Sequence, residues 1–237
     1  MTVVYRRSGA RHTATLTPTA DENGHYKAGV WVRDSGAGIG TMSFVDPQRG
    51  TFAGLGHSIS DADTGADLTL LSGEIVPVTI TGCIRGAAGS PGELRGEFAA
   101  APAGTVLAND AAGVYGSYTG SCTAPALPVA NLQEVTPGEA ELWTTVLGTT
   151  AQPYTIQVER VTMTGSDPNR NLLIRVTDKR LLDATGGVVQ GMSGSPIVQN
   201  GRLAAVLTHV LVNDPSRGYA IFATTMLEKA DAVASSK

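Results

Sequence analysis

Long apolar runs and a leader sequence are both missing from this chain of 237 residues. No run of about 18 apolar residues occurs, so no segment has the length and apolarity of a transmembrane helix. The first residues, MTVVYRRSGARHTATLTP, alternate like a strand pair and lack the charged and then apolar regions of a secretory signal. We therefore expect that the chain as given neither spans a membrane nor directs its own export.

Clustered positive charge and metal-binding patterns are also missing. The formal net charge is -4, and the arginines are scattered along the chain. Proteins that bind a phosphate backbone usually present a basic patch, so nucleic acid is not an expected partner. Cys83 and Cys122 permit one disulfide without requiring it, and no spacing of cysteine and histidine matches a zinc site. We expect neither a metal nor any other cofactor.

The composition favours short strands joined by tight turns. Charged residues make up 16% and aromatic residues 5% of the chain, while glycine occurs 29 times and proline 12 times. Turn signals such as Asp46–Gly50 and Asn200–Gly201 separate the runs of β character. Helical periodicity appears in two segments, residues 178–185 and 223–234. The predicted fold is therefore all-β. The expected strands are VWV, TMSFV, TFAGLG, LTLL, EIVPVTI, AELWTTVLG, YTIQVERVTMT and NLLIRVT.

The chain also shows signs of more than one unit. Residues 3–17 predict a hairpin around Ser8-Gly9, followed by a polar stretch, which is typical of the tail of a preceding unit. Residues 85–113 are rich in Gly, Ala and Pro and predict either a long loop or the joint between two lobes. With a joint there, His57 falls in the first lobe and Ser193 in the second, so the two could meet in a cleft.

The segment GMSGSP at residues 191–196 carries a candidate nucleophile. Its glycines permit a bend in which several backbone N–H groups point at one spot, as a developing oxyanion requires. We assign Ser193 as the nucleophile and the amides of Gly191 and Ser193 as the oxyanion donors. Ser195 is the rival nucleophile, but Pro196 after it favours extended geometry away from the apex. Plain turns of glycine and serine are also common.

A serine nucleophile needs a base, and the chain has four histidines. His12 and His25 lie in the polar leader and are expected to be solvated. His57 follows an apolar strand among small residues, and its alternative role is that of a turn histidine. His209 closes the strand RLAAVLTH, and its alternative role is that of an ordinary strand residue.

The order of these residues discriminates between catalytic templates. An α/β-hydrolase requires an acid and then a histidine after the serine, but no Asp or Glu lies between Ser193 and His209. The chymotrypsin order, with histidine early and serine late on two β-barrels, fits His57 and Ser193. In that arrangement the strand that carries His209 and Val210 forms a wall of the substrate pocket. The role of base for His209 is a second option.

The orienting carboxylate has several candidates. Asp61 and Asp63 lie close to the histidine in sequence, and Asp110 suits the chymotrypsin spacing best. Asp178 stands before a predicted helix, where its alternative role is that of an N-cap.

Three segments resemble the sporulation stage IV protein B (SpoIVB) family, which are serine peptidases of spore-forming bacteria. The segments are RDSGAGIGTMSFVDPQRGTFAGLGHSISDADTG, RVTDKRLLDATGGVVQGMSGSPIVQNGRL and VLTHVLVNDPSRGYAIFATTML. They bracket residues 33–227, with a looser match over roughly 85–165. Residues 1–19 resemble the last strands of the PDZ domain that precedes the peptidase in this family, which leaves 20–237 as the peptidase domain.

The resemblance implies a trypsin-like double β-barrel with a short C-terminal helix. It also implies a serine endopeptidase that cleaves itself and a membrane-tethered regulator of an intramembrane protease, in a signal from forespore to mother cell. The expected location is the space between the forespore and mother-cell membranes. Matched residue by residue, the family's histidine, aspartate and serine fall on His57, Asp178 and Ser193. For the aspartate we follow the resemblance, in preference to the spacing that favours Asp110.

Two rival functions have to be weighed against this enzyme. A peptide-binding or scaffold module could use a protease-like fold to hold a partner without cutting it, and an esterase could use the same serine and histidine. The presence of both catalytic residue types favours the peptidase, because an inactive homologue usually lacks one of them.

Overall fold

The computed structural model describes residues 1–7, 9–30, 36–61, 63–165 and 167–235. The chain divides into two compact units, Met1–Ala37 and Gly38–Lys237. In the first unit, strand β1 (Thr2–Arg7) pairs with β2 (Ala10–Thr15), and β3 (Thr19–Ala20) pairs with β4 (Tyr26–Lys27). The hairpin predicted over residues 3–17 is therefore confirmed. The strand predicted at VWV lies outside the described residues except for Val30. The domain boundary after residue 19 stays a prediction.

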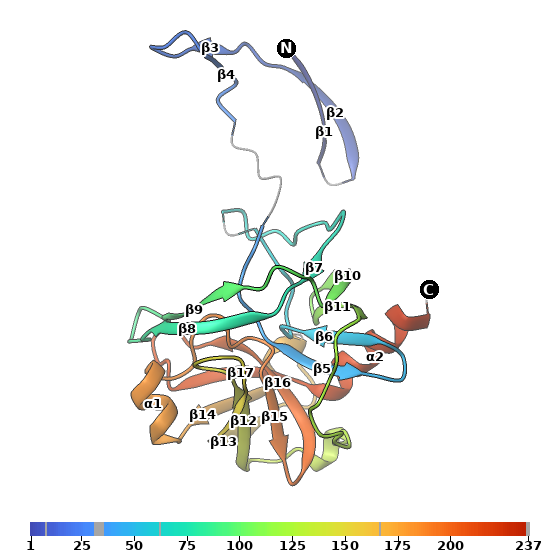
Figure 1. Cartoon of the computed structure of the whole chain (residues 1–237), viewed down its shortest axis with the longest axis vertical. Coiled ribbons are helices and arrows are strands. Elements are labelled where there is room, and N and C mark those ends of the chain that lie inside the picture. Colours follow the sequence, from blue (N-terminus) through green and yellow to red (C-terminus); the bar gives the residue numbers. More distant parts are fainter. Residues whose placement is uncertain (8, 31–35, 62, 166, 236–237) are drawn as a thin grey trace. The chain divides into compact units, whose positions relative to one another are not determined.

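The first half of the second unit is an open antiparallel sheet of five strands, in the order β5-β6-β11-β10-β7 (Figure 1). Phe52, Val106 and Val114 form its small apolar core. Asp46 organises the turn between the first two strands, because its carboxylate accepts from the N–H groups of Gln48 and Arg49. The strands are β5 (Met42–Asp46), β6 (Thr51–Gly54), β7 (Glu74–Ile75), β10 (Gly104–Asp110) and β11 (Gly113–Tyr118).

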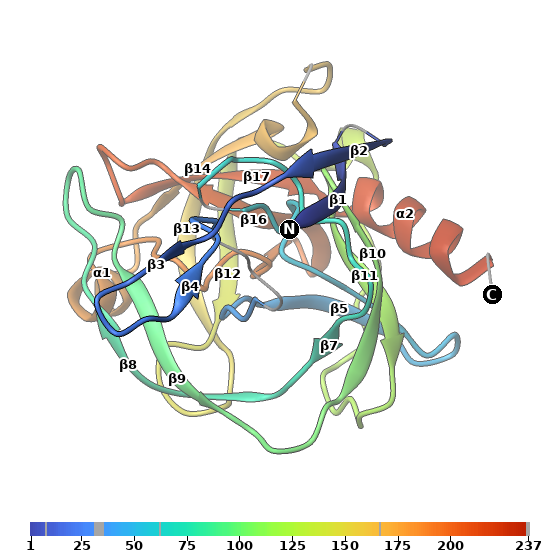
Figure 2. The ribbon, with the colours of Figure 1, turned by 90° about the horizontal axis from the view of Figure 1, so that it is seen from above.

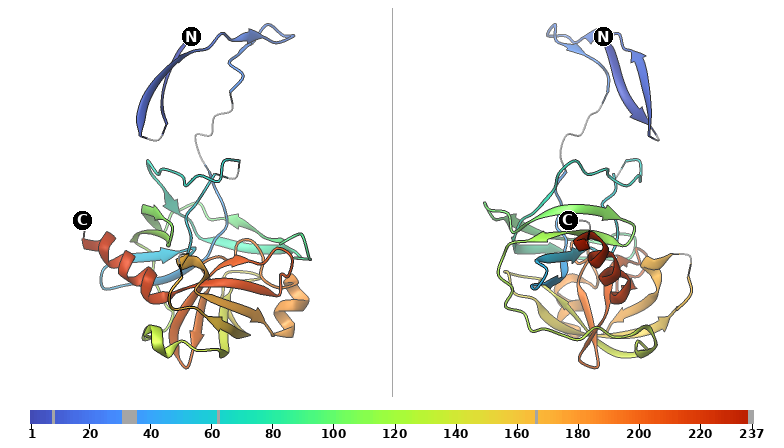
Figure 3. Two further views of the ribbon diagram at one scale, coloured as in Figure 1. Left: turned by 180° about the vertical axis from the view of Figure 1, so that it is seen from behind. Right: turned by 90° about the vertical axis from the view of Figure 1, so that its right-hand side faces the viewer.

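The second half is a closed barrel in the order β12-β13-β14-β17-β16-β15, which Figure 3 shows from two further sides. Closure leaves no free sheet edge along most of each strand. The predicted turn at Asn200-Gly201 joins β15 to β16, and both residues have positive φ, as a tight hairpin turn requires. The strands are β12 (Gly138–Thr144), β13 (Gln152–Val161), β14 (Leu172–Val176), β15 (Pro196–Gln199), β16 (Arg202–Val210) and β17 (Arg217–Phe222).

The remaining elements are a separate two-stranded ribbon and the helices. A separate ribbon pairs β8 (Val78–Ile84) with β9 (Glu93–Phe98), and short 3-10 helices cover Leu132–Glu134 and Pro168–Arg170. Helix α1 spans Lys179–Thr185 and α2 spans Ala223–Ser235, close to the two predicted helical segments. The expected all-β fold of two β halves with a short C-terminal helix is confirmed. One half is a closed barrel and the other an open sheet.

The prediction of a loop or joint over residues 85–113 is wrong. This segment contains β9 and β10, and the two halves are joined by residues 119–137. Its glycines are strand residues that permit close packing: a Cβ on Gly96 would lie 2.7 Å from the Thr79 carbonyl oxygen, and one on Gly104 would lie 2.2 Å from that of Ser117. Glycine here therefore marks backbone contact between neighbouring strands.

Two predicted strands also need correction. The run LTLL at residues 68–71 forms no strand, and Leu71 is fully exposed. The run EIVPVTI is divided at Pro77, so that β7 and β8 belong to different sheets. Proline lacks the N–H that would continue a ladder, which explains the break.

Helix α2 packs where the two halves meet (Figure 2). Met226 and Ala230 of α2 lie in one buried cluster with residues from both halves. The cluster includes Ala53 and Tyr115 of the open sheet and Val206 and Ile221 of the barrel. The helix therefore stabilises the junction between the halves. Among the described residues, no helix is both long and apolar enough to cross a bilayer.

We expect Met226→Ala to lower the free energy of unfolding by about 2 to 5 kcal/mol, because Met226 is fully buried between the halves. Urea denaturation followed by circular dichroism measures the change. Met163→Ala is the matched control, since Met163 is 47% exposed, and its effect should stay within about 0.5 kcal/mol. Equal losses in the two variants would contradict the role given to α2.

Candidate active site

A strained turn positions His57 at the end of β6. Gly56 N–H donates to the Gly54 carbonyl at 2.8 Å, and Leu55 between them has a φ of 68°. This geometry is a γ-turn, which is rare for a residue other than glycine. Gly56 lies directly on the barrel, because a Cβ there would be 2.9 Å from the Thr208 methyl group. The turn therefore places His57 against β16.

The His57 ring makes one hydrogen bond that defines its tautomer. Nδ1 lies 2.7 Å from the carbonyl oxygen of Ser58. A carbonyl oxygen can only accept, so the proton is on Nδ1. In the neutral ring Nε2 then carries a free lone pair. His57 is thus in the tautomer that a general base needs.

The turn that carries Ser193 packs against the open sheet. The Thr41 N–H donates to the Ser193 carbonyl at 2.8 Å, and the Thr41 hydroxyl donates to the Gly191 carbonyl at 3.1 Å. A Cβ on Gly194 would lie 1.9 Å from the Thr41 carbonyl oxygen, and Gly194 has a φ of 98°. Both constraints restrict this position to glycine. The two halves of the second unit are therefore in backbone contact beside Ser193.

Two amides of this turn are free of partners among the described residues, namely those of Gly191 and Ser193. Each of these N–H groups belongs to a peptide whose carbonyl accepts a hydrogen bond. The Gln190 carbonyl accepts from Leu94 N–H at 2.8 Å, and the Met192 carbonyl accepts from Ser195 N–H at 2.9 Å. Because the carbonyl and N–H of a trans peptide point in opposite directions, both free amides have defined orientations. They are available to an anion.

The hydroxyl of Ser193 donates to the Thr208 carbonyl at 2.7 Å. The next residue, His209, has its ring centroid 4.9 Å from that of His57. Thr208 and His209 therefore link Ser193 and His57, which the structure brings to the same end of β16. The Ser193 proton points at Thr208 in this state, and the structure has no hydrogen bond between Ser193 and His57, both of which it describes.

The other sequence-level candidates differ in accessibility. Ser195 is completely buried, and its hydroxyl has no hydrogen-bond partner among the described residues. It is thus a poor rival to Ser193. Partial burial lowers the pKa of His209, and the nearby His57 and Arg170 lower it further, against the opposite effect of Asp167. His12 and His25 belong to the first unit and are exposed.

The Asp178 carboxylate caps helix α1, as its position before the helix suggested. It accepts from Arg180 N–H at 2.8 Å, from the Arg180 guanidinium at 2.7 Å and from Thr155 N–H at 3.3 Å. The Arg180 side chain holds the pKa of Asp178 down to about 2, and the backbone bonds add to this effect. The structure gives Asp178 no hydrogen bond to His57, so its catalytic assignment stays a prediction.

The carboxylates of Asp110 and Asp61 are also engaged elsewhere. Asp110 accepts from Ala112 N–H at 2.8 Å and pairs with Lys229 at 3.3 Å. Asp61 accepts from the N–H groups of Asp63 and Thr64 in its own loop. The structure shows no carboxylate hydrogen-bonded to the imidazole of His57 among the residues it describes.

Sequence reasoning missed Thr41 and Thr208. Thr41 lies within TMSF and Thr208 within AVLTH, where neither has a motif. Both act mainly through backbone groups, which every residue type carries, so no sequence signal identified them.

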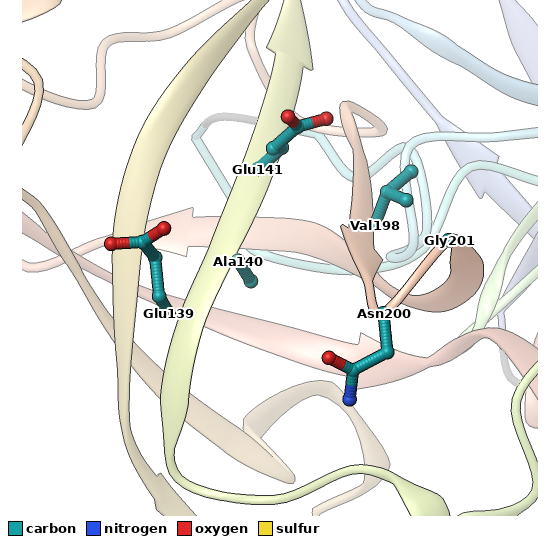
Figure 4. Close-up of a pocket in the computed structure, with 6 residues that line it drawn as sticks. All are labelled: Glu139, Ala140, Glu141, Val198, Asn200 and Gly201. Carbon is teal, nitrogen blue, oxygen red and sulfur yellow. The ribbon is translucent and has the colours of Figure 1, made fainter.

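Other possible sites are weaker. No group of three or more His, Cys, Asp or Glu within the described ranges could hold a metal ion, and Cys83 and Cys122 are both free thiols. A shallow hollow lies between β12 and the turn from β15 to β16 (Figure 4). It contains none of the candidate catalytic residues. Its lining is Glu139, Ala140, Glu141, Val198, Asn200 and Gly201.

The model of one protein family, described as SpoIVB peptidase S55, matches residues 24–227. Together with the two β halves, this match defines the class of the protein, which is a serine peptidase. Because the match covers most of the chain, the chain belongs to the SpoIVB peptidase family. A comparison with curated proteins finds no match.

Solved structures similar to the chain include two forms of the Rv3671c protease. The inactive form is 16% identical over 60% of this chain and 72% of its own, with a TM-score of 0.40. The active form, from M. tuberculosis, is 16% identical over 67% of this chain and 79% of its own, with a TM-score of 0.41.

We expect Asp178→Asn to lower the free energy of unfolding at pH 7 by about 1 to 2 kcal/mol, since the Arg180 partner is largely exposed and screened. A carboxyl whose folded pKa is depressed to about 2 stabilises the fold above its unfolded pKa. This contribution disappears as the pH falls from about 4 towards 2. The free energies of unfolding of the parent and the variant should therefore converge at low pH.

Urea denaturation across this pH range measures the difference. Asp183→Asn, on the exposed side of the same helix, is the control and should change the free energy of unfolding by no more than about 0.5 kcal/mol. A pH-independent difference for Asp178→Asn would contradict the capping role.

Proposed function

We propose that Ser193 and His57 are the nucleophile and base of an endopeptidase of the SpoIVB type. One observation supports this most strongly. The free Nε2 of His57, the Ser193 hydroxyl and the two unpaired amides of Gly191 and Ser193 all lie around the same end of β16. These are the groups that acyl transfer requires.

The proposed reaction begins when the Ser193 hydroxyl turns from Thr208 to Nε2 of His57. Nε2 takes the hydroxyl proton as Oγ attacks the peptide carbonyl, and the amides of Gly191 and Ser193 bind the oxyanion. His57 then gives the proton to the leaving amine, and the C–N bond breaks. Water activated by the same Nε2 hydrolyses the acyl-enzyme and restores the Ser193 hydroxyl.

The substrate backbone would bind along the edge of β16. Strand β15 pairs with β16 only as far as Val206, so the edge from Thr208 to Val210 is not covered by β15. Leu211 N–H donates to Arg217 at 3.0 Å, towards β17. Successive residues of a strand direct their backbone groups to opposite sides, so those of Val210 point away from β17. An extended peptide can add there as a strand, with His209 and Val210 as part of the pocket wall.

The resemblance to the family supports a finer proposal. We propose that the peptidase cleaves itself and a membrane-tethered regulator of an intramembrane protease, in signalling from forespore to mother cell during sporulation. Its expected place is between the two membranes, and its expected upstream neighbour is a PDZ domain, of which residues 1–19 would be the tail. Asp178 is the third catalytic member that the family implies.

One observation favours a second function, that of a peptide-binding module without catalysis. The Ser193 hydroxyl is bonded to Thr208 and not to His57. A protein that held this arrangement permanently would bind a peptide along β16 without attacking it.

We expect a fluorophosphonate probe to label Ser193, because His57 can take the hydroxyl proton as fluoride leaves. Labelling, measured by mass spectrometry of the tryptic peptides, should be lost in Ser193→Ala and fall at least about 100-fold in His57→Ala. Ser195→Ala is the matched control and should still be labelled, since Ser195 is buried. Labelling that persists in Ser193→Ala would refute the assignment.

We expect the purified chain to shorten itself over time, and the shortening to stop in Ser193→Ala. Intact mass spectrometry during incubation measures it. Mixing Ser193→Ala with a small amount of parent protein tests cleavage between molecules. An unchanged mass in the parent, together with retained peptide binding, would instead support the binding module.

A further inference from the structure

The imidazole of His57 is oriented by a backbone group. In a Ser-His-Asp triad, a buried carboxylate accepts from Nδ1–H and holds both the tautomer and the ring position. Here the acceptor is the Ser58 carbonyl, at 2.7 Å. The carboxylates of Asp178 and Asp110 are bonded to other groups. The orientation of His57 therefore depends on what fixes the Ser58 carbonyl.

That carbonyl belongs to a rigid peptide whose other end is held by Asn109. The peptide joins Ser58 C=O to Ile59 N–H, and the structure shows no cis peptide among its described residues. In a trans peptide the two groups point in opposite directions. Ile59 N–H donates to Oδ1 of Asn109 at 2.7 Å. The Asn109 side chain thus fixes the plane that presents the Ser58 oxygen to His57.

Asn109 is itself well anchored. Its Nδ2 donates to the Ile59 carbonyl at 2.9 Å and to the Leu68 carbonyl at 3.0 Å. Oδ1 and both N–H donors therefore have partners, and Asn109 lies in β10 of the open sheet. The Ser58 hydroxyl also donates to Asp67, which secures the same loop. The loop after His57 is thereby fastened to a regular strand.

We propose that the Ser58–Ile59 peptide, held by Asn109, orients the ring of the base His57 and fixes its tautomer. This inference rests on the proposed function. Asn109 is a positioning residue, because it acts through one peptide and touches no reacting atom. The hydrogen bond that Asn109 Oδ1 accepts from Ile59 N–H also polarises this peptide. The polarisation makes the Ser58 carbonyl a stronger acceptor for His57.

The chain offers a matched control for Asn109. Gln199, at the end of β15 away from Pro196, makes the same kind of clamp with its side-chain amide. It accepts from Thr136 N–H at 3.1 Å and donates to the carbonyls of Thr136 at 2.9 Å and Glu139 at 3.3 Å. Asn109→Leu and Gln199→Met each remove one such clamp with little change of side-chain size, and comparable losses of thermal stability are expected.

The first readout is the tautomer of His57, measured by 15N NMR of histidine-labelled protein with Ser193→Ala, where the His57 signal is assigned by its loss in His57→Gln. The parent should show the proton on Nδ1, whereas an unrestrained imidazole favours Nε2. Asn109→Leu should shift the proton towards Nε2, and Gln199→Met should not. Because the NMR measurement needs no activity, it decides the orienting role of Asn109 even if the protein cleaves no peptide. Failure to cleave any peptide would refute the proposed function but not the orienting role.

The second readout is the kinetics of peptide cleavage well below the melting temperature. Asn109→Leu should lower kcat by about tenfold or more with KM within about twofold, because misorientation of the base affects the chemical step. Gln199→Met should leave both constants close to the parent values. The proposal is overturned if the two variants lose kcat equally, or if Asn109→Leu changes the tautomer without lowering kcat. It is also overturned if Asp178→Asn, and not Asn109→Leu, changes the tautomer.

Discussion

The backbone contact between the Ser193 turn and the open sheet is the constraint on which the rest of the site depends. Gly194 has no room for a side chain against Thr41, and its φ of 98° disfavours one in any case. The Thr41 N–H holds the Ser193 carbonyl across the same junction. The proposed nucleophile, Ser193, and the proposed base, His57, come from different halves of the fold, so their alignment depends on this contact. The buried cluster around Met226 of α2 stabilises the same junction, since it includes Ala53 of the open sheet and Val206 of the barrel.

Local signals predicted much of the fold. The β-rich composition, the Asn200-Gly201 turn and the two helical segments all depend on neighbours in sequence, and the structure has them. The predictions of secondary structure failed where a segment's strand partner is distant in sequence. Gly96 and Gly104 suggested a loop, yet each permits close packing against a strand that the sequence does not reveal. LTLL has strand-like residues but finds no strand to pair with among those described. Pairing, and not propensity, decides such segments.

The same distinction divides the candidate site. Ser193 and His57 could be singled out because the proposed chemistry depends on their side chains. Thr41, Thr208 and Asn109 could not, since they contribute by holding backbone groups, and many residue types could occupy those positions in a sequence. For Asp178, the helix-capping role is visible in its bonds to Arg180 and Thr155. Its catalytic role stays a prediction from the family. A carboxylate in the expected place can thus stabilise a helix, while a peptide carbonyl meets the imidazole.

The bond from Ser193 to the Thr208 carbonyl has a consequence for how the resting molecule behaves. The Thr208 carbonyl oxygen lies on the edge of β16 that β15 does not cover. A backbone N–H of a bound substrate could donate to the same oxygen. An arriving polypeptide and the hydroxyl therefore compete for one oxygen, and the exchange of one hydrogen bond for another costs little free energy. The Ser193 hydroxyl would then become reactive only after a polypeptide of suitable conformation has bound. This would protect other proteins from unselective cleavage.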